Sequence, residues 1–292
     1  MQIVANGIGI EVDDQGPAGA EPLLLIMGLG MQLFAWPDEL VQLLVSRGFR
    51  VIRFDNRDIG LSQGFDHLGV PNLPWAAARY MMHLPLHTPY GISDMAADAL
   101  GVLDALGLPR AHVCGASMGG MIAQHLAARH PQRVSSLTLM MSSSGARQLP
   151  RPHWRVQRAL LKRPDGHDAA AVVAHLERLF ALIGSPAYPP EPTALRQRLH
   201  ASVRRSWHPA GTARQLAAVV ADGDRSALLP LIRTPTTVIH GLADPLIPVA
   251  SGHDLVARIA GARADMVPGM GHDLPQQLLS RFADRMSENA RR

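Results

Sequence analysis

Short apolar runs rich in β-branched residues alternate with segments of helical periodicity along most of the chain, and this alternation constrains the fold more than any other feature. Such a pattern is typical of a parallel β-sheet with helices packed on its faces. We therefore predict an α/β fold. The predicted strands are 22–28, 49–55, 111–116, 134–141, 235–240 and 262–267, and the predicted helices are 38–47, 93–106, 118–130, 249–260 and 275–288.

Two further strands are predicted at the N-terminus, at 2–5 and 8–12. The dipeptide Asn6-Gly7 lies between them and favours a tight turn, so the pair is expected to form an antiparallel hairpin. With this pair the sheet has eight strands and is mostly parallel. Ser93 is a candidate N-cap for the second helix, and Gly107 is a candidate for the residue that ends it.

The alternation stops between about residues 145 and 229. This segment has several helical patterns, is interrupted by "SPAYPPEP", and lies between two predicted strands. We interpret 145–229 as a helical cap over one edge of the sheet, and 1–144 together with 230–292 as the core domain. A second stretch without strands, 64–92, has one short helical pattern.

Composition limits the classes of function. The net charge is +4 and the isoelectric point is near 9.9, but Lys162 is the single lysine among 28 basic residues, and the arginines are spread among acidic residues. A nucleic-acid partner would require a clustered basic face, so none is expected. The sequence has no apolar run long enough to span a membrane and no secretory signal, which favours a cytoplasmic location. Cys114 is the single cysteine, which excludes an internal disulfide and a cysteine-built metal site.

The segment "GASMG", 115–119, matches the G-x-S-x-G pattern of a nucleophile elbow. An apolar run precedes it and a helical pattern follows it, as the elbow requires. A sharp turn between strand and helix would expose the hydroxyl of Ser117 beyond the end of the sheet. The N-terminus of the helix would then direct free N–H groups at the site where negative charge develops during acyl transfer. The alternative is a small residue in a packed turn.

A serine nucleophile needs a base and an acid that orients the base, in the chain order serine, acid, histidine. Asp244 follows a predicted strand in "HGLADPLIP" and is the preferred acid, although a turn-forming role before Pro245 is the alternative. His272, in the glycine-rich loop "MVPGMGHDLP", is the preferred base. The further candidate acids are Asp222, Asp224 and Asp254, and the further candidate bases are His112, His240 and His253. Asp273 is expected to be solvated.

The oxyanion produced by such a reaction needs two backbone N–H donors. Met118, directly after the serine, would supply one. Leu29 in "IMGLG" would supply the other, with Gly28 and Gly30 allowing the backbone to turn inward. The alternative is that these glycines only serve a tight turn. The sequence shows no metal-ligand cluster, and "MGLGMQ" lacks the spacing of a dinucleotide fingerprint, so no cofactor is expected.

With these residues in place, the chain resembles the α/β-hydrolase superfamily, and within it the esterases related to aclacinomycin methylesterase. The resemblance covers about 20–145 and 232–275. It is carried by "MGLGMQLFAWPDEL", "VIRFDNRDIGLS", "PYGISDMAADALGVLDALGLPRAHVCGASMGGMIAQ" and "PGMGHDLP".

The resemblance extends to one turn outside the predicted catalytic residues. Asp55, Arg57, Gly60 and Ser62 match the superfamily turn D-x-R-x-x-G-x-S, which by similarity braces the loop after the fourth strand. Many relatives have His-Gly where this chain has Met27-Gly28. The cap is not similar to the family, so the family's substrate does not follow from the resemblance.

The sequence favours a serine hydrolase that cleaves carboxylic esters of small to medium, fairly apolar substrates through an acyl-enzyme. The same three residues also serve C–C bond hydrolysis, lactone opening, amide cleavage and cofactor-free perhydrolysis. Haloalkane dehalogenation is disfavoured because it uses an aspartate at the position of Ser117. A non-catalytic ligand receptor of the same fold is the alternative from a different class, and no oligomeric state is predicted.

Overall fold

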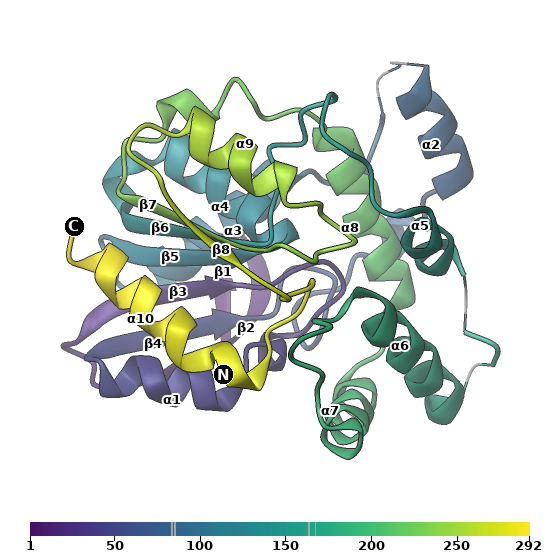
Figure 1. Ribbon diagram of the computed structural model, residues 1–292, viewed down its shortest axis with the longest axis horizontal. Helices are drawn as coiled ribbons and strands as arrows, with labels where there is room; N and C mark the ends of the chain where they lie inside the picture. The colour runs from purple at the N-terminus through teal and green to yellow at the C-terminus, as the bar shows by residue number, and fades with distance from the viewer. Residues whose placement is uncertain (83, 85, 163, 167) are drawn as a thin grey trace.

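The computed structural model describes residues 1–82, 84, 86–162, 164–166 and 168–292. The described residues form an eight-stranded sheet in the order β1-β2-β4-β3-β5-β6-β7-β8, flanked by helices (Figure 1). This confirms the predicted α/β class. The strands are β1 Gln2–Ala5, β2 Ile8–Gln15, β3 Glu21–Ile26, β4 Phe49–Phe54, β5 Ala111–Ala116, β6 Val134–Met140, β7 Thr236–Gly241 and β8 Arg263–Val267.

Strands β3 to β8 pair in parallel, and β1 and β2 pair antiparallel, as predicted. Asn6 and Gly7 both have positive φ, at 50° and 76°, which is the backbone conformation that a two-residue hairpin turn of this type requires. Strand β2 continues to Gln15, beyond the predicted end, because residues 12–15 pair antiparallel with β4.

The predicted core helices are present, with ends that differ by a few residues. They are α1 Asp38–Ser46, α3 Ile92–Ala105, α4 Met118–Arg129, α9 Ala250–Arg258 and α10 Leu279–Ala290. Gly107 follows α3 with φ 67°, as expected of the residue that ends a helix. The prediction that Ser93 caps α3 is wrong: the cap position is Gly91, whose N–H donates to Oδ2 of Asp94 at 2.7 Å, so Ser93 lies in the first turn.

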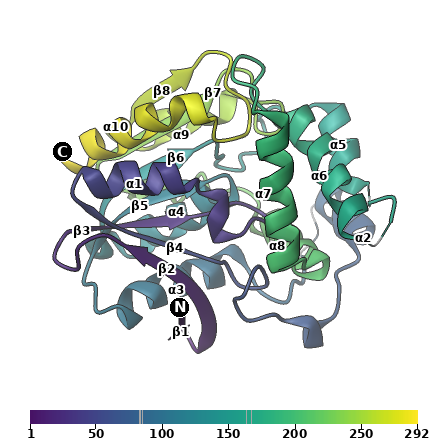
Figure 2. The ribbon, with the colours of Figure 1, turned by 90° about the horizontal axis from the view of Figure 1, so that it is seen from below.

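The helices form two layers, one on each face of the sheet (Figure 2). Leu23 and Leu25 of β3 belong to a core cluster with residues of α1 and α10, whereas Leu24 and Ile26 belong to the cluster with residues of α3, α4 and α9. Alternate residues of a strand point to opposite faces, so a fully apolar strand can fill both clusters. This explains why the central strands read as continuous apolar runs.

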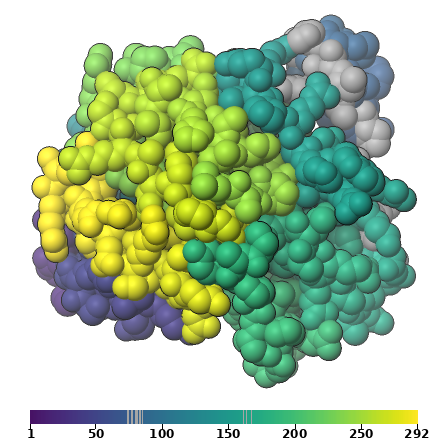
Figure 3. All heavy atoms as spheres, viewed as in Figure 1, coloured from purple at the N-terminus to yellow at the C-terminus, as the bar shows by residue number. Residues whose placement is uncertain are grey.

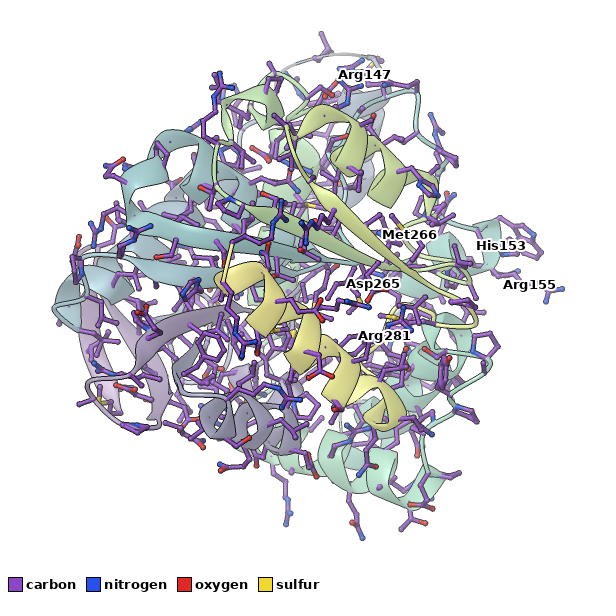
Figure 4. The ribbon with its side chains drawn as sticks, turned by 60° about the vertical axis from the view of Figure 1, so that its left-hand side comes forward. Arg147, His153, Arg155, Asp265, Met266 and Arg281 are labelled. Carbon is purple, nitrogen blue, oxygen red and sulfur yellow. The ribbon has the colours of Figure 1, made fainter. Side chains whose placement is uncertain are left out.

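Strand β8 is an edge of the sheet, and charged side chains flank it. Asp265 of β8 and Arg281 of α10 face each other (Figure 4) and form an ion pair that Arg285 joins at 3.3 Å. Charged groups along an edge strand oppose the addition of a strand from another chain. Among the described residues, the helices are all too short or too polar to cross a lipid bilayer.

A helical segment is inserted between β6 and β7, in the region predicted to lack strands. Its helices are α5 Trp154–Leu161, α6 Ala169–Ile183, α7 Pro192–Arg205 and α8 Pro209–Asp222. They gather with α2, Leu73–Met81, on one side of the sheet in both ribbon views (Figures 1 and 2). In the space-filling view the teal and green atoms of the insert occupy the right-hand part of the molecule (Figure 3). Residues 83 and 85 of the stretch 64–92 lie outside the described part of the chain.

A buried ion pair joins this insert to the core. Arg214 of α8 donates to both carboxylate oxygens of Asp58, each at 2.7 Å, and both side chains are 0% exposed. Tyr90 also donates to Asp58, at 2.7 Å. Burial alone would raise the pKa of Asp58, but the hydrogen bonds from Arg214 and Tyr90 lower it below its ordinary value. The pair stays charged in the interior because each partner satisfies the other.

We predict that Arg214→Met lowers the free energy of unfolding by about 3 to 5 kcal/mol, because Asp58 would stay buried without its counter-charge. Urea denaturation measures the change. The matched control is Arg196→Met, which removes an exposed pair with Glu177 and is expected to have little effect. Equal stabilities of the two variants would contradict the prediction.

Helix α4 packs unusually close to the sheet through glycines. A Cβ placed on Gly119 would lie 2.0 Å from the carbonyl oxygen of Ile26, and one on Gly115 would lie 2.2 Å from that of Gly119. On Gly120 it would lie 2.6 Å from the side chain of Ser142. Only glycine therefore allows the start of α4 to lie against the ends of β3 and β5.

Gly119→Ala should destabilise the protein by about 1 to 3 kcal/mol, because a methyl group would force backbone against backbone. Thermal unfolding followed by circular dichroism measures the loss. Gly9→Ala is the control, since a Cβ there meets nothing within 4 Å. If Gly119→Ala has the same Tm as the control, α4 can move away from the sheet without a loss of stability.

Candidate functional site

Ser117 occupies the turn between β5 and α4. Its backbone has φ 55° and ψ −119°, a conformation that non-glycine residues rarely adopt. The turn is held from both sides: the Ser117 N–H donates to the carbonyl of Met140 at 2.9 Å, and its own carbonyl accepts from Oγ of Ser142 at 2.8 Å. The side chain therefore projects past the end of the sheet, as the sequence pattern predicts.

The structure brings His272 and Asp244 to this serine. Nε2 of His272 lies 3.0 Å from Oγ of Ser117, and Nδ1 of His272 lies 2.7 Å from Oδ2 of Asp244. Asp244 follows β7 and His272 follows β8, so three strand ends supply the three side chains. Such an arrangement can transfer a proton from a hydroxyl to an imidazole whose other nitrogen is held by a carboxylate.

Asp244 is oriented by the backbone that follows it. Its Oδ1 accepts from the N–H groups of Leu246 and Ile247 at 2.9 and 2.8 Å, which leaves Oδ2 directed at His272. Its side chain is fully buried. Two fixed donors on one oxygen keep the carboxylate from rotating, so the imidazole of His272 is held in one orientation.

His240, a further candidate base from the sequence, lies next to Asp244, with Nε2 at 3.7 Å from Oδ2. Its side chain is fully buried, and burial lowers its pKa, which keeps the ring neutral. Nε2 lies 2.8 Å from the carbonyl of Ile247 and therefore carries the proton, since a carbonyl only accepts. The ring packs against Gly252, where a Cβ would lie 2.8 Å from Nδ1. His240 thus holds the loop of Asp244 through its hydrogen bond to the carbonyl of Ile247.

The remaining candidate acids and bases lie away from Ser117, each with its own surroundings. Asp222 binds His125 and Arg225, Asp224 accepts from the N–H of Ser226, and Asp254 binds Ser144 and Arg258. His112 contacts Ser136, and His253 lies exposed on α9. The structure therefore places the preferred acid and base, and none of these five, beside Ser117.

The two backbone N–H groups predicted as oxyanion donors belong to residues next to Ser117 and in the loop after β3. Met118 is the first residue of α4, so its N–H has no intrahelical acceptor. Leu29 lies in the loop after β3, next to Gly28, where a Cβ would lie 3.1 Å from Cβ of Ser117. Among the described residues we find no acceptor for either N–H. The neighbouring N–H of Gly30 is already used, because it donates to Oε1 of Gln215 at 2.9 Å.

The resemblance implies that the turn after β4 braces the loop that follows this strand, and Asp55 forms hydrogen bonds within that loop and to Leu33. Oδ1 of Asp55 accepts from the N–H of Leu33 at 2.7 Å, and Oδ2 accepts from the N–H of Leu61 at 2.9 Å. Arg205 of α7 donates to Oδ2 at 2.6 Å, so the insert takes part. Burial raises the pKa of Asp55 despite these bonds.

The remaining residues of that turn have matching structural roles. The side chains of Arg57 and Asp98 form a buried ion pair, with Nη2 2.6 Å from Oδ1. Gly60 has φ 64°, and a Cβ there would collide with the carboxylate of Asp55. The hydroxyl of Ser62 donates to the carbonyl of Asp55 at 2.5 Å.

The expectation that Asp273 is solvated is wrong. Its carboxylate is half-buried and accepts hydrogen bonds from the hydroxyl and the N–H of Ser185, and burial raises its pKa. The same hydroxyl accepts from the N–H of Gly271 at 2.8 Å, and the N–H of His272 donates to the carbonyl of Ile183 at 2.7 Å. The segment after α6 thus holds the loop of His272.

Sequence reasoning missed Ser185 and Gln215, both of which lie in the insert and touch the loops of His272 and Leu29. No motif marks them. The one signal available was that an apolar helix such as α8 carries a glutamine, which turns out to be fully buried. A buried amide must satisfy its donors and acceptor within the protein.

One group of side chains has the composition of a cation site. Asp58, Asp66 and His208 each offer a ligand atom within 4.8 Å of the others. Arg214 donates to both carboxylates, at 2.7 and 2.8 Å, so a guanidinium already supplies the positive charge there. This group joins the insert to the core.

Comparison with known proteins identifies the family of the chain. The family model described as alpha/beta hydrolase fold matches residues 21–275. Rhodomycin D methylesterase of Streptomyces sp. (strain C5) is 32% identical, in an alignment that covers 89% of this chain and 87% of the relative. 2-Hydroxymuconate semialdehyde hydrolase of Pseudomonas sp. (strain CF600) is 29% identical, with 98% and 92% covered.

Among solved structures, a meta-cleavage product hydrolase from Pseudomonas fluorescens IP01 superimposes with a TM-score of 0.77 at 19% identity, covering 99% of this chain and 96% of that one. An enol-lactonase from Burkholderia xenovorans LB400 gives 0.76 at 23% identity, with both chains fully covered. These two likenesses concern the fold. The family match spans most of the chain, and the chain belongs to the alpha/beta hydrolase fold family.

Proposed function

We propose that this protein is a serine hydrolase that cleaves carboxylic esters, with Ser117 as nucleophile, His272 as general base and acid, and Asp244 as the group that orients His272. The observation that carries the proposal is the continuous path from Oγ of Ser117 to Nε2 of His272 at 3.0 Å and from Nδ1 to Asp244 at 2.7 Å. The similarity to a methylesterase over most of the chain supports the ester as substrate.

In the first half of the reaction, His272 accepts the proton of Ser117 at Nε2 while Oγ forms a bond to the ester carbonyl carbon. Asp244 accepts the hydrogen bond from Nδ1–H and stabilises the imidazolium that results. The tetrahedral intermediate collapses when the bond to the alcohol oxygen breaks, and the imidazolium gives its proton to that oxygen. The alcohol leaves, and the acyl group stays on Ser117.

In the second half, His272 takes a proton from water, whose oxygen attacks the acyl carbon. The C–O bond to Ser117 then breaks, the imidazolium returns a proton to Oγ, and the carboxylic acid leaves. The N–H groups of Leu29 and Met118 would hold the negative oxygen in both intermediates. The use of the Gly30 N–H by Gln215 supports Leu29 as the donor from this loop.

We infer further that 145–229 is a cap that covers the site and shapes the acyl and alcohol pockets, since its residues contact the loops of Leu29 and His272. The aromatic residues of the insert support substrates of small to medium size and fairly apolar character; they are Trp154, Phe180, Tyr188 and Trp207. C–C bond hydrolysis is the second candidate, because 2-hydroxymuconate semialdehyde hydrolase is similar over nearly the whole chain. An activity screen over short-chain p-nitrophenyl esters, methyl esters of bulky acids, lactones and a vinylogous 1,5-diketone acid separates these chemistries.

Replacement of Ser117 by alanine is expected to lower kcat for p-nitrophenyl acetate by at least about 10³-fold, because the nucleophile is gone. Steady-state kinetics measure the loss, and a fluorophosphonate probe should label the native protein but not the variant. Ser280→Ala, at an exposed serine of α10, serves as control. Undiminished turnover by Ser117→Ala would refute the proposal.

Asp244→Asn is expected to lower kcat by about 10³- to 10⁴-fold, because an amide can donate to Nδ1 and favour the wrong tautomer of His272. The control is Asp224→Asn, at an exposed aspartate that is a candidate acid from the sequence, and it should keep native kcat. If the two variants have equal activity, Asp244 does not orient the base.

A further inference from the structure

Helix α8 of the insert reaches the loop that carries Leu29 through one buried side chain. Gln215 is 0% exposed. Its Oε1 accepts from the N–H of Gly30 at 2.9 Å, and its Nε2 donates to the carbonyl of Arg57 at 2.8 Å. A single amide therefore connects the insert to the loop after β3 and to the turn after β4.

The amide of Gln215 has one orientation, fixed by its partners. The N–H of Gly30 only donates and the carbonyl of Arg57 only accepts, so the oxygen faces Gly30 and the nitrogen faces Arg57. If the amide oxygen and nitrogen were exchanged, the N–H of Gly30 and the carbonyl of Arg57 would both lose their hydrogen bonds, which is unfavourable for buried groups. The position of Gly30 is thereby set by a rigid helix.

The loop also lies in close contact with the same helix. Gly30 has φ 68°, and a Cβ there would lie 2.9 Å from Cγ2 of Thr212, one turn of α8 before Gln215. The hydrogen bond from Gly30 holds the peptide plane between Leu29 and Gly30. This plane adjoins the Gly28–Leu29 peptide, which carries the N–H of Leu29, so it restricts that peptide from one side. The same bond engages the N–H of Gly30, whereas the N–H of Leu29 has no acceptor among the described residues.

We propose that Gln215 is a positioning residue for the oxyanion site: it acts through Gly30 to hold the N–H of Leu29 in the direction that the developing oxyanion requires. This inference rests on the proposed function. Loss of one oxyanion donor costs an enzyme about 10²- to 10³-fold in kcat. A donor that is present but less well aligned should cost less, so we expect a loss of about 10- to 100-fold.

The test compares Gln215→Met, which keeps the shape of the side chain without its hydrogen bonds, with Gln215→Glu. Burial raises the pKa of a carboxyl group, and the protonated acid can still accept from Gly30 and donate to Arg57. Ser202→Ala is the control from the same interface, because it removes a contact with Gln32 and does not touch Gly30. Thermal unfolding first checks that each variant is folded.

For Gln215→Met we expect kcat for p-nitrophenyl esters to fall about 10- to 100-fold while KM changes less than about threefold. Inhibition by a trifluoromethyl ketone, which forms an anionic adduct with the serine, should weaken by a similar factor. Gln215→Glu should keep more of kcat than Gln215→Met, and Ser202→Ala should be native. A purely structural role would instead change KM and stability without a selective loss of inhibitor affinity.

Hydrogen–deuterium exchange of the peptide that contains Gly30 gives a readout independent of activity, and exchange should be faster in Gln215→Met. Faster exchange with native kcat and native inhibitor affinity would overturn the role of Gln215. So would slow exchange in Gln215→Met, because the bond would then not hold the loop. If the native protein hydrolyses no ester faster than Ser117→Ala does, the proposed function is wrong. The exchange data would still show whether Gln215 holds the loop.

Discussion

The close approach of α4 to the ends of β3 and β5 is the constraint on which the rest of the site depends. Gly119 lies so near the carbonyl of Ile26 that no side chain fits between them. Because the helix starts this close to the sheet, the chain must turn sharply at Ser117 and adopts a strained backbone there. Met118 follows directly as the first residue of α4, and Gly28, in the loop of Leu29, lies against the side chain of Ser117.

The insert contacts the loops that carry Leu29 and His272. Its residues hydrogen-bond to two loops at the carboxyl ends of strands: Gln215 binds Gly30, and Ile183 and Ser185 bind the loop of His272. Buried ion pairs such as Arg214 with Asp58 fix the insert to the core. Movement of the insert away from the core as one unit would have to break these bonds.

The sheet, the core helices and the side chains that lie beside Ser117 were predicted from the sequence because each of them has a local sequence signal. Apolar periodicity marks the strands and helices, and the glycines of "GASMG" mark a turn that only they allow. The cap predicted at Ser93 belongs two residues earlier, because the side chain of Asp94 captures the N–H of Gly91. Local patterns place an element well and its ends less well.

The sequence by itself determined the α/β architecture, and it predicted that Ser117, Asp244 and His272 lie together because each follows a predicted strand in the expected chain order. Only the tertiary structure decided what holds them. Gln215, Ser185 and the half-buried Asp273 act across more than 80 residues of chain. Their partners are mostly backbone N–H and carbonyl groups, which nearly every residue has, so no sequence pattern distinguishes them. Distance along the chain and the uniformity of the backbone are the physical reasons that this part required coordinates.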